Sequence, residues 1–285
     1  MRIAFIGLGQ MGRRMVRRLN PQDTGVWNRS RDIVAVLGGE GYQPITDLEE
    51  GVRSADVIVT MVRDHHAIRA VGEAGLFAGL GPQTLWVDMT TGSPAAGESF
   101  HGLAASQGAR FIAAPVLGTL GPAASGQLTV LAGGAPQDID AAQPLLERFG
   151  TVRNVGTVRQ ALVLKLMVNT LLAAYMDAVS ECLPVADREG IKRAELLSIL
   201  AESSVAAPVL KGKRIRWESL NYQEPDFPIQ LLAKDLNLMM EVAKEQRLDM
   251  PGAGALREVF EMASRIDGKG SWDMAGVGDA LVPPM

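Results

Sequence analysis

Short apolar runs alternate with helical patterns through the first half of the chain. The first run, Ile3–Ile6, carries no charge, which suits a strand buried on both faces of a parallel sheet. Repeated strand-then-helix units predict a doubly wound parallel sheet, in which ligands lie at the carboxyl ends of the strands. Further strand-like runs, several of them separated by helical patterns, occur at 25–30, 55–62, 85–89, 111–116 and 129–132.

A glycine-rich turn follows the first strand directly. Gly7, Gly9 and Gly12 have the spacing G-x-G-x-x-G, and apolar and basic residues mix at helical spacing from Met11 to Leu19. Strand, glycine turn and helix are the context that a dinucleotide-binding site needs. Gly7 permits the tight turn, Gly9 lets the backbone approach a pyrophosphate, and Gly12 lets the helix pack closely on the strand.

The pattern changes near Gly156. Residues 158–187 predict one long helix, and most of the chain after it is helical too. We therefore predict an α/β protein with two domains joined by this long helix. Residues 1–157 form an N-terminal Rossmann dinucleotide-binding domain, and residues 158–285 form a C-terminal all-α domain for substrate binding and oligomerisation.

The end of the second predicted strand indicates which cofactor is bound. A fold that selects NAD usually places an acidic residue here to hold the ribose 2′-hydroxyl. This chain has none and offers Asn28, Arg29 and Ser30, with Arg31 following. A guanidinium and two small hydrogen-bonding side chains suit a 2′-phosphate, which favours NADP(H) over NAD. The alternative is a polar turn with solvated arginines.

Composition excludes several classes of function. The 285 residues carry a net charge of −4, which provides no basic field for nucleic acid. A single cysteine, Cys182, excludes an internal disulfide and a cysteine metal cluster, and we expect it to be buried packing. Three histidines support a metal site poorly, so none is expected. No signal pattern precedes the first strand, so a cytoplasmic protein is expected.

The start of the long helix is apolar almost all the way round, yet it contains a lysine. Residues 161–176 are too short for a membrane span and carry Lys165 in their middle, so we expect a buried helix and no membrane partner. Asn169 lies four residues on, and therefore on the same face. The alternative is a lysine whose stem packs while its ammonium reaches the surface.

A lysine at this place suits hydride-transfer chemistry. The protein must hold a carbonyl beside the nicotinamide and supply a proton to the developing alkoxide. Lys165 as an ammonium would stabilise the oxyanion and donate that proton. In the oxidative direction a neutral Lys165 would accept the hydroxyl proton, and desolvation favours the neutral form. Asn169 would orient the substrate by hydrogen bonds.

The chain resembles the β-hydroxyacid dehydrogenase family over essentially its whole length. That family includes 3-hydroxyisobutyrate dehydrogenases, tartronate semialdehyde reductases and glyoxylate/succinic semialdehyde reductases. Five motifs in the family's order carry the resemblance: the cofactor loop 7–12, the D-x-S-T-x-x-P segment at 88–94, the substrate loop beginning at 114–119, the K-x-x-x-N pair Lys165 and Asn169, and the K-D-L element at 234–236.

The strand ends and the resemblance together define the expected sites. The resemblance implies that Thr91 lies by the nicotinamide and that Lys234 reaches the cofactor from the helical domain. Catalysis is assigned to Lys165 and Asn169. The expected cofactor contacts are Gly7, Leu8, Gly9, Gln10, Met11, Gly12, Asn28, Arg29, Ser30, Met61, Val62, His66, Thr91 and Lys234. The expected substrate contacts are Thr91, Leu117, Gly118, Thr119, Lys165 and Asn169.

The substrate loop departs from the family pattern. Leu117 replaces the family's serine and Thr119 its second glycine, while Arg159 and Ala161 replace two glycines before the lysine. Thr119 with Pro122 resembles the semialdehyde-reductase branch. Arg159 would either bind a substrate carboxylate or be solvated.

The resemblance predicts an NADP-dependent oxidoreductase that interconverts a short hydroxy acid and its semialdehyde or keto acid. It also implies a homodimer or homotetramer. The alternatives are an imine reductase-like enzyme acting on a non-acid substrate and a non-catalytic NADP-binding scaffold. The altered loop residues leave the individual substrate open.

Overall fold

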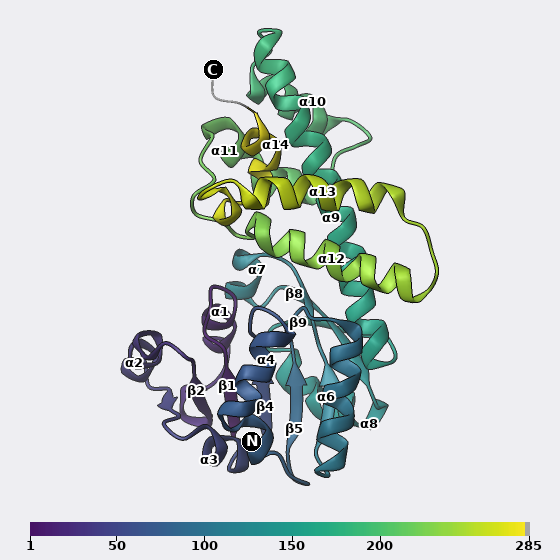
Figure 1. Ribbon diagram of the computed structural model, residues 1–285. Helices are drawn as coiled ribbons and strands as arrows, with labels where there is room; N and C mark the ends of the chain where they lie inside the picture. The colour runs from purple at the N-terminus through teal and green to yellow at the C-terminus, as the bar shows by residue number, and fades with distance from the viewer. Residues whose placement is uncertain (283–285) are drawn as a thin grey trace. The chain divides into compact units, whose positions relative to one another are not determined.

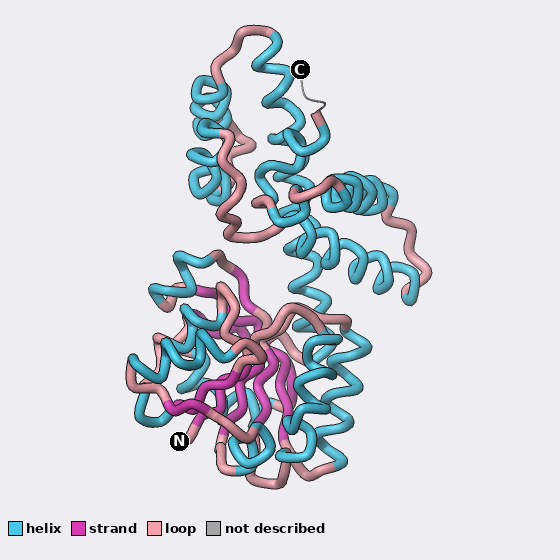
Figure 2. The backbone as a smooth tube through the Cα atoms, turned by 60° about the vertical axis from the view of Figure 1, so that its left-hand side comes forward, coloured by secondary structure: helices cyan, strands magenta, loops and turns pink. Residues whose placement is uncertain are grey.

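The chain folds into two compact units. The structure, a computed structural model, describes residues 1–282, and its contacts separate Met1–Lys165 from the residues that begin at Leu166. The predicted fold class is confirmed, because a Rossmann unit is followed by a helical one (Figures 1 and 2). Helix α9 (Val158–Arg188) begins in the first unit and continues into the second. The boundary at 157/158 stays a prediction.

The first unit is built on one sheet with the strand order β3-β2-β1-β4-β5-β6-β8-β7, and β9 pairs with β8. The register pairs Ile3 of β1 with Thr24 of β2 and with Val57 of β4, all in parallel, as the doubly wound pattern predicts. The strands are β1 Ile3–Ile6, β2 Thr24–Trp27, β3 Gln43–Pro44, β4 Val57–Thr60, β5 Leu85–Asp88, β6 Arg110–Ala113, β7 Val116–Leu117, β8 Leu128–Gly134 and β9 Gly150–Asn154.

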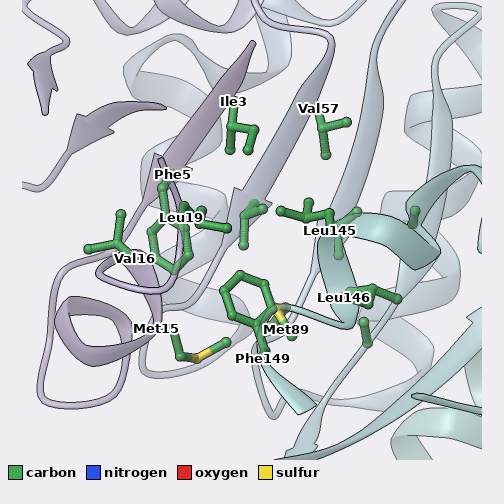
Figure 3. Close-up of a cluster of buried hydrophobic side chains, with 14 of the residues drawn as sticks. Ile3, Phe5, Met15, Val16, Leu19, Val57, Met89, Leu145, Leu146 and Phe149 are labelled. Atoms are coloured by element: carbon green, nitrogen blue, oxygen red, sulfur yellow. The ribbon is translucent and has the colours of Figure 1, made fainter. Parts of the chain in front are cut away.

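Helices accompany the sheet, and both faces of the central strands are buried. Phe5 of β1 contributes to one apolar cluster and Ile6 to another, as expected where successive side chains point to opposite faces. Figure 3 shows Phe5 with Met15 and Phe149 in the first of these clusters. The helices are α1 Gly12–Val16, α2 Arg31–Gly39, α3 Leu48–Arg53, α4 His65–Val71, α5 Phe77–Gly79, α6 Pro94–Ser106, α7 Leu120–Ser125 and α8 Pro136–Leu146.

Three local details differ from the sequence prediction. The run 111–116 is divided between β6 and β7, with Ala114 and Pro115 between them, because proline has no N–H for a continuous ladder. Strand β8 runs antiparallel to both β6 and β7, so the sheet is mixed and not wholly parallel. Strands β3 and β9 were not predicted, because Gln43–Pro44 is only two residues long and Gly150–Asn154 has only one apolar residue.

The second unit is helical through the residues that the structure describes. A third apolar cluster forms its core, and α9 contributes to it through Ala173, Met176 and Leu183. By length and composition α9 is apolar enough to cross a membrane, as core helices of soluble proteins also are. The remaining helices are α10 Arg193–Glu202, α11 Pro208–Ser219, α12 Ile229–Glu245, α13 Pro251–Arg265 and α14 Val277–Leu281.

One prediction on α9 is wrong. Cys182 is exposed and is not part of the core. The next residue, Leu183, points inward and is fully buried. Successive residues of a helix are about 100° apart around its axis, so an apolar sequence alone does not say which of the two faces the core.

Candidate active site

The three glycines of the cofactor loop differ in which atoms an added Cβ would meet. Gly7 has φ +100°, and a Cβ on it would overlap the carbonyl oxygen of Met61. A Cβ on Gly12 would overlap the carbonyl oxygen of Gly7, so the turn and the start of α1 pack directly on each other. By contrast, no atom lies within 4 Å of the corresponding position on Gly9. The open space at Gly9 is what a closely approaching pyrophosphate requires.

The end of β2 is tied to this loop by an asparagine. Asn28 Oδ1 accepts a hydrogen bond from the N–H of Leu8 at 3.1 Å, and its Nδ2 donates to the carbonyl of Ser30 at 3.1 Å. Asn28 therefore braces the glycine loop against the following turn. The neighbouring Arg29 and Ser30 are exposed. The guanidinium of Arg31 donates to the Ile45 carbonyl oxygen at 3.1 Å.

The segments after β4 and β5 complete this edge of the sheet. Because β1, β4 and β5 are parallel, their carboxyl ends lie at the same edge. Met61, Val62 and Thr91 are all half-buried there. His66, at the start of α4, is exposed, and its ring lies against that of His65 with centroids 4.1 Å apart and the planes tilted by 38°.

A buried carboxyl that sequence reasoning left without a role lies under these segments. Asp88, the last residue of β5, is 3% exposed. Burial raises its pKa to about 6, while hydrogen bonds from Thr60 and Thr90 act in the opposite direction. A lone charged residue at the end of an otherwise apolar strand is the sequence signal that could have identified it.

The predicted substrate loop crosses from β7 to α7. Leu117 ends β7 and is half-buried, Gly118 has φ +125°, and Thr119 precedes the first residue of α7. Arg159, at the start of α9, forms an ion pair with Glu98 of α6 at 3.1 Å. Its guanidinium is therefore not simply solvated, and a substrate carboxylate would compete with Glu98 for it.

Two buried polar residues lie one turn apart on α9. Lys165 is 9% exposed and Asn169 is 2% exposed, so the lysine does not reach freely into solvent. Asn169 belongs to the second unit, where its Nδ2 donates to Asp235 Oδ2 of α12 at 2.6 Å. Asp235 also forms an ion pair with its neighbour Lys234 at 3.0 Å. This role of Asp235, 66 residues from Asn169, was missed because no sequence pattern links the two positions.

The predicted residues thus fall into two groups. The cofactor loop, the β2 end and the segments after β4 and β5 are all in the first unit, as is Lys165. Asn169 and Lys234 are in the second unit, and the expected contact of Lys234 with the cofactor stays a prediction. Within residues 1–282 no group of His, Cys, Asp and Glu side chains is arranged to hold a metal ion.

Two sequence families match the chain, one after the other. Residues 2–160 match the family described as the NAD binding domain of 6-phosphogluconate dehydrogenase. Residues 160–281 match the family described as NAD-binding of NADP-dependent 3-hydroxyisobutyrate dehydrogenase. Together the two matches extend over nearly the whole chain.

Individual relatives agree with these matches. Glyoxylate/succinic semialdehyde reductase 1 of Arabidopsis thaliana is 29% identical over 99% of this chain and 98% of its own. An uncharacterised oxidoreductase of Bacillus subtilis is 30% identical over 92% and 93%. The solved structure of Mycobacterium tuberculosis 3-hydroxyisobutyrate dehydrogenase with L-serine has a TM-score of 0.86 at 22% identity, over 99% of this chain and 100% of its own, which indicates the same fold.

Proposed function

The chain belongs to the β-hydroxyacid dehydrogenase family and is an NAD(P)-dependent dehydrogenase or reductase, and we propose that it uses NADP(H) to interconvert a short β-hydroxy acid, or a related hydroxy acid, and its semialdehyde or keto acid. The observation that carries this proposal is Lys165, buried on α9 one turn before Asn169. The name of the Arabidopsis relative, a glyoxylate/succinic semialdehyde reductase, supports the substrate class.

The first unit has the features needed to hold the cofactor. The backbone at Gly9 is open to a pyrophosphate, and the exposed Arg29 and Ser30 are available to a 2′-phosphate. Asn28 holds the turn that carries them. Bound NADPH would supply the hydride, and we propose residues 1–157 as the domain that holds it. The remaining proposed contacts in this domain are Leu8, Gln10, Met11, Met61, Val62, His66 and Thr91.

Lys165 is proposed as the general acid and base. Its Nζ as an ammonium would stabilise negative charge on the carbonyl oxygen during reduction and donate a proton to it. In the reverse direction the neutral amine would remove the hydroxyl proton. A buried position suits both roles, because water neither screens the charge nor competes for the proton.

Asn169 is proposed to orient the substrate, and its own orientation follows from its partner. A carboxylate only accepts hydrogen bonds, so the Asn169 amide must turn its nitrogen toward Asp235. Its Oδ1 then faces away from Asp235 and can accept a hydrogen bond from a hydroxyl or an ammonium. Asp235 is thus expected to fix which way the amide points.

The substrate loop favours a substrate with an apolar portion. Leu117 offers a methyl-bearing side chain where the family has a serine hydroxyl, while Thr119 keeps one hydroxyl nearby. We propose Thr91, Leu117, Gly118 and Thr119 as substrate contacts.

We also propose a homodimer or homotetramer. Met167, Leu171 and Val185 of α9 are 46%, 72% and 61% exposed, and a second copy would cover such side chains.

The test is turnover by the purified full-length protein, followed through NADPH absorbance. The panel is glyoxylate, succinic semialdehyde, tartronate semialdehyde, methylmalonate semialdehyde and a cyclic imine, each with NADPH and with NADH. Turnover of an aldehyde acid that is faster with NADPH supports the proposal. Turnover of the imine alone would replace it with an imine reductase, and NADPH binding without any turnover would indicate a scaffold.

Replacing the lysine separates chemistry from binding. Lys165→Ala should lower kcat by about 10²–10⁴-fold, the usual contribution of a general acid or base, and leave NADPH affinity unchanged. Lys244→Ala is the matched control, because Lys244 is an exposed lysine in the last turn of α12. Retention of turnover by Lys165→Ala would show that another group transfers the proton.

A further inference from the structure

A cluster of four buried polar side chains links the carboxyl ends of β4 and β5. Thr60 and Asp88 are the last residues of these strands, face each other in the register, and are 0% and 3% exposed. Thr60 Oγ1 donates to Asp88 Oδ1 at 2.8 Å and accepts from Trp86 Nε1 at 2.9 Å. A hydroxyl has one proton, so the indole donor on one side directs that proton to the carboxylate on the other.

The fourth member joins this pair to the next segment. The N–H of Thr90 donates to Asp88 Oδ1 at 3.1 Å, and the Thr90 hydroxyl also bonds the Asp88 carboxyl. Thr90 Oγ1 in turn accepts from the N–H of Val62 at 3.2 Å. One carboxylate therefore holds the segment after β4 and the segment after β5 together. We call Thr60, Trp86, Asp88 and Thr90 the Asp88 cluster.

Both segments carry proposed cofactor contacts. Met61 and Val62 follow Thr60 directly, and Thr91 follows Thr90. The segment after β4 also packs against the glycine loop, since a Cβ on Gly7 would overlap Met61 and come within 2.8 Å of Val62 Cγ1. A shift of Val62 would therefore disturb its hydrogen bond with Thr90 and its packing against Gly7.

Burying the Asp88 cluster costs more free energy than burying apolar side chains in the same space. Burial makes the ionised form of Asp88 unfavourable, as its raised pKa shows. An apolar pair at Thr60 and Asp88 would pack without that cost, since buried polar groups destabilise unless every one of them is paired. Unlike apolar side chains, the polar cluster constrains geometry. Hydrogen bonds are directional, so the Asp88 carboxylate that accepts from Thr60 and Thr90 specifies where each donor must lie.

We propose that Asp88 is a positioning residue that, through Thr60 and Thr90, holds Val62 and Thr91 in the places from which they contact NADP(H). It touches neither cofactor nor substrate, and it acts on cofactor affinity through the backbone at 61–62 and 90–91. This inference rests on the proposed binding of NADP(H) at this edge of the sheet.

The experiment compares threonines at the two ends of the sheet. Thr60→Val keeps the shape of the side chain and removes the hydroxyl, which leaves both Trp86 Nε1 and Asp88 short of a partner. Thr84→Val is the matched control. Thr84 is 2% exposed, precedes the first residue of the same strand β5, and donates its hydroxyl to the Gly81 carbonyl at 2.8 Å, at the edge away from the proposed site.

The readout is the Kd for NADPH, measured by fluorescence on each full-length variant, with Tm measured alongside. We expect Thr60→Val to raise the Kd about tenfold, the equivalent of one buried hydrogen bond, and Thr84→Val to lower Tm without changing the Kd. Thr60→Ser, which restores the hydroxyl but not the methyl group, should recover most of the lost affinity. If Thr60→Val does not fold, Thr90→Val serves in its place, because it removes the link from Val62 to Asp88.

Three outcomes decide the matter. A raised Kd with rescue by serine supports the inference. An unchanged Kd in Thr60→Val or Thr90→Val, with a fall in Tm like that of Thr84→Val, overturns it and leaves the cluster a purely structural role. Failure of the unmodified protein to bind NADPH would overturn the proposed function, and the inference with it.

Discussion

Two charged side chains, Lys213 in the second unit and Arg29 in the first, are placed in opposite ways. Lys213 is 1% exposed, and its Nζ lies 2.7 Å from Oδ2 of Asp273, which is fully buried. Arg29, by contrast, is exposed in the turn that Asn28 ties to the glycine loop. Removing the Lys213 charge should therefore cost folding stability, and removing the Arg29 charge should cost ligand affinity.

The second unit needs its buried charges because its connections are irregular. Asp273 accepts backbone N–H bonds from Asp226, Phe227 and Ala275 as well as the Lys213 ammonium. It thereby ties the segment between α11 and α12 to the segment after α13. The backbone N–H and C=O groups inside a helix bond to one another, so they offer no hydrogen bonds to the segments that connect the helices. In the first unit, by contrast, the backbone groups of neighbouring strands bond directly to each other in the sheet.

A similar arrangement fixes the C-terminal helix. Arg193, at the start of α10, is 2.7 Å from both Asp187 and Asp279. The hydroxyl of Tyr222 donates to Asp279 as well, and burial with this neighbouring carboxylate raises the pKa of Tyr222. These residues come from four separate segments of the second unit. Buried charges here are part of the fold and do not by themselves mark a binding site.

The largest expected effect comes from breaking the buried pair. Lys213→Met should destabilise the protein by about 3–5 kcal/mol, because it leaves Asp273 charged and buried with its main partner gone. Urea unfolding measures the loss, and hydrogen exchange should locate faster opening between α11 and the segment after α13. Arg17→Met is the control: it breaks an exposed first-unit pair with Glu40, and should cost about 1 kcal/mol or less. Equal losses in the two variants would remove the distinction between buried and exposed charge pairs.

A smaller effect, on binding and not on folding, is expected at Arg29. Arg29→Ala should weaken NADPH binding about 10–100-fold, the value of a charge-assisted contact to phosphate, and leave NADH binding unchanged. Titrations with both cofactors give the ratio of affinities. Arg31→Ala is the matched control, since Arg31 already donates to the Ile45 carbonyl and should not change that ratio. An equal loss of both cofactors in Arg29→Ala would argue against a 2′-phosphate contact.

The smallest expected effect is on stability, at Asp177 of α9 in the second unit. Burial, and then the nearby charge of Glu181, raise the pKa of Asp177 to about 6, and its Oδ1 lacks a hydrogen-bond partner among residues 1–282. A folded pKa above the unfolded value gives stability that is present below about pH 4 and is lost as pH rises through about 6. Asp177→Asn should remove that loss.

The gain is small because Asp177 is only half buried. We expect Asp177→Asn to stabilise the protein by about 1 kcal/mol near pH 8 and by almost nothing near pH 4. Urea unfolding at the two pH values measures this difference. Glu181→Gln, which removes only the second cause, should give a smaller gain of the same sign. A gain that is equal at both pH values would mean that packing, and not ionisation, is responsible.

Local patterns in the sequence were sufficient for the parts of the site that depend on neighbouring residues. The strand Ile3–Ile6, the glycine turn and the long helix are all encoded by spacing within a few residues. The packing roles of Gly7 and Gly12 could be stated in advance, because a missing Cβ acts on whatever lies next to the turn. Lys165 and Asn169 shared a helix face by their spacing alone.

Other features of the molecule depend on contacts between residues far apart in the chain. Asn169 meets Asp235, Arg159 meets Glu98, and Thr60 meets Asp88 through pairings that no local period encodes. The outward turn of Cys182 and the antiparallel course of β8 were likewise set by packing. Local sequence patterns were enough to predict most of the helices and strands and the residues capable of chemistry. The tertiary structure determined which polar groups are paired, because each buried donor or acceptor takes the partner that the fold brings within reach.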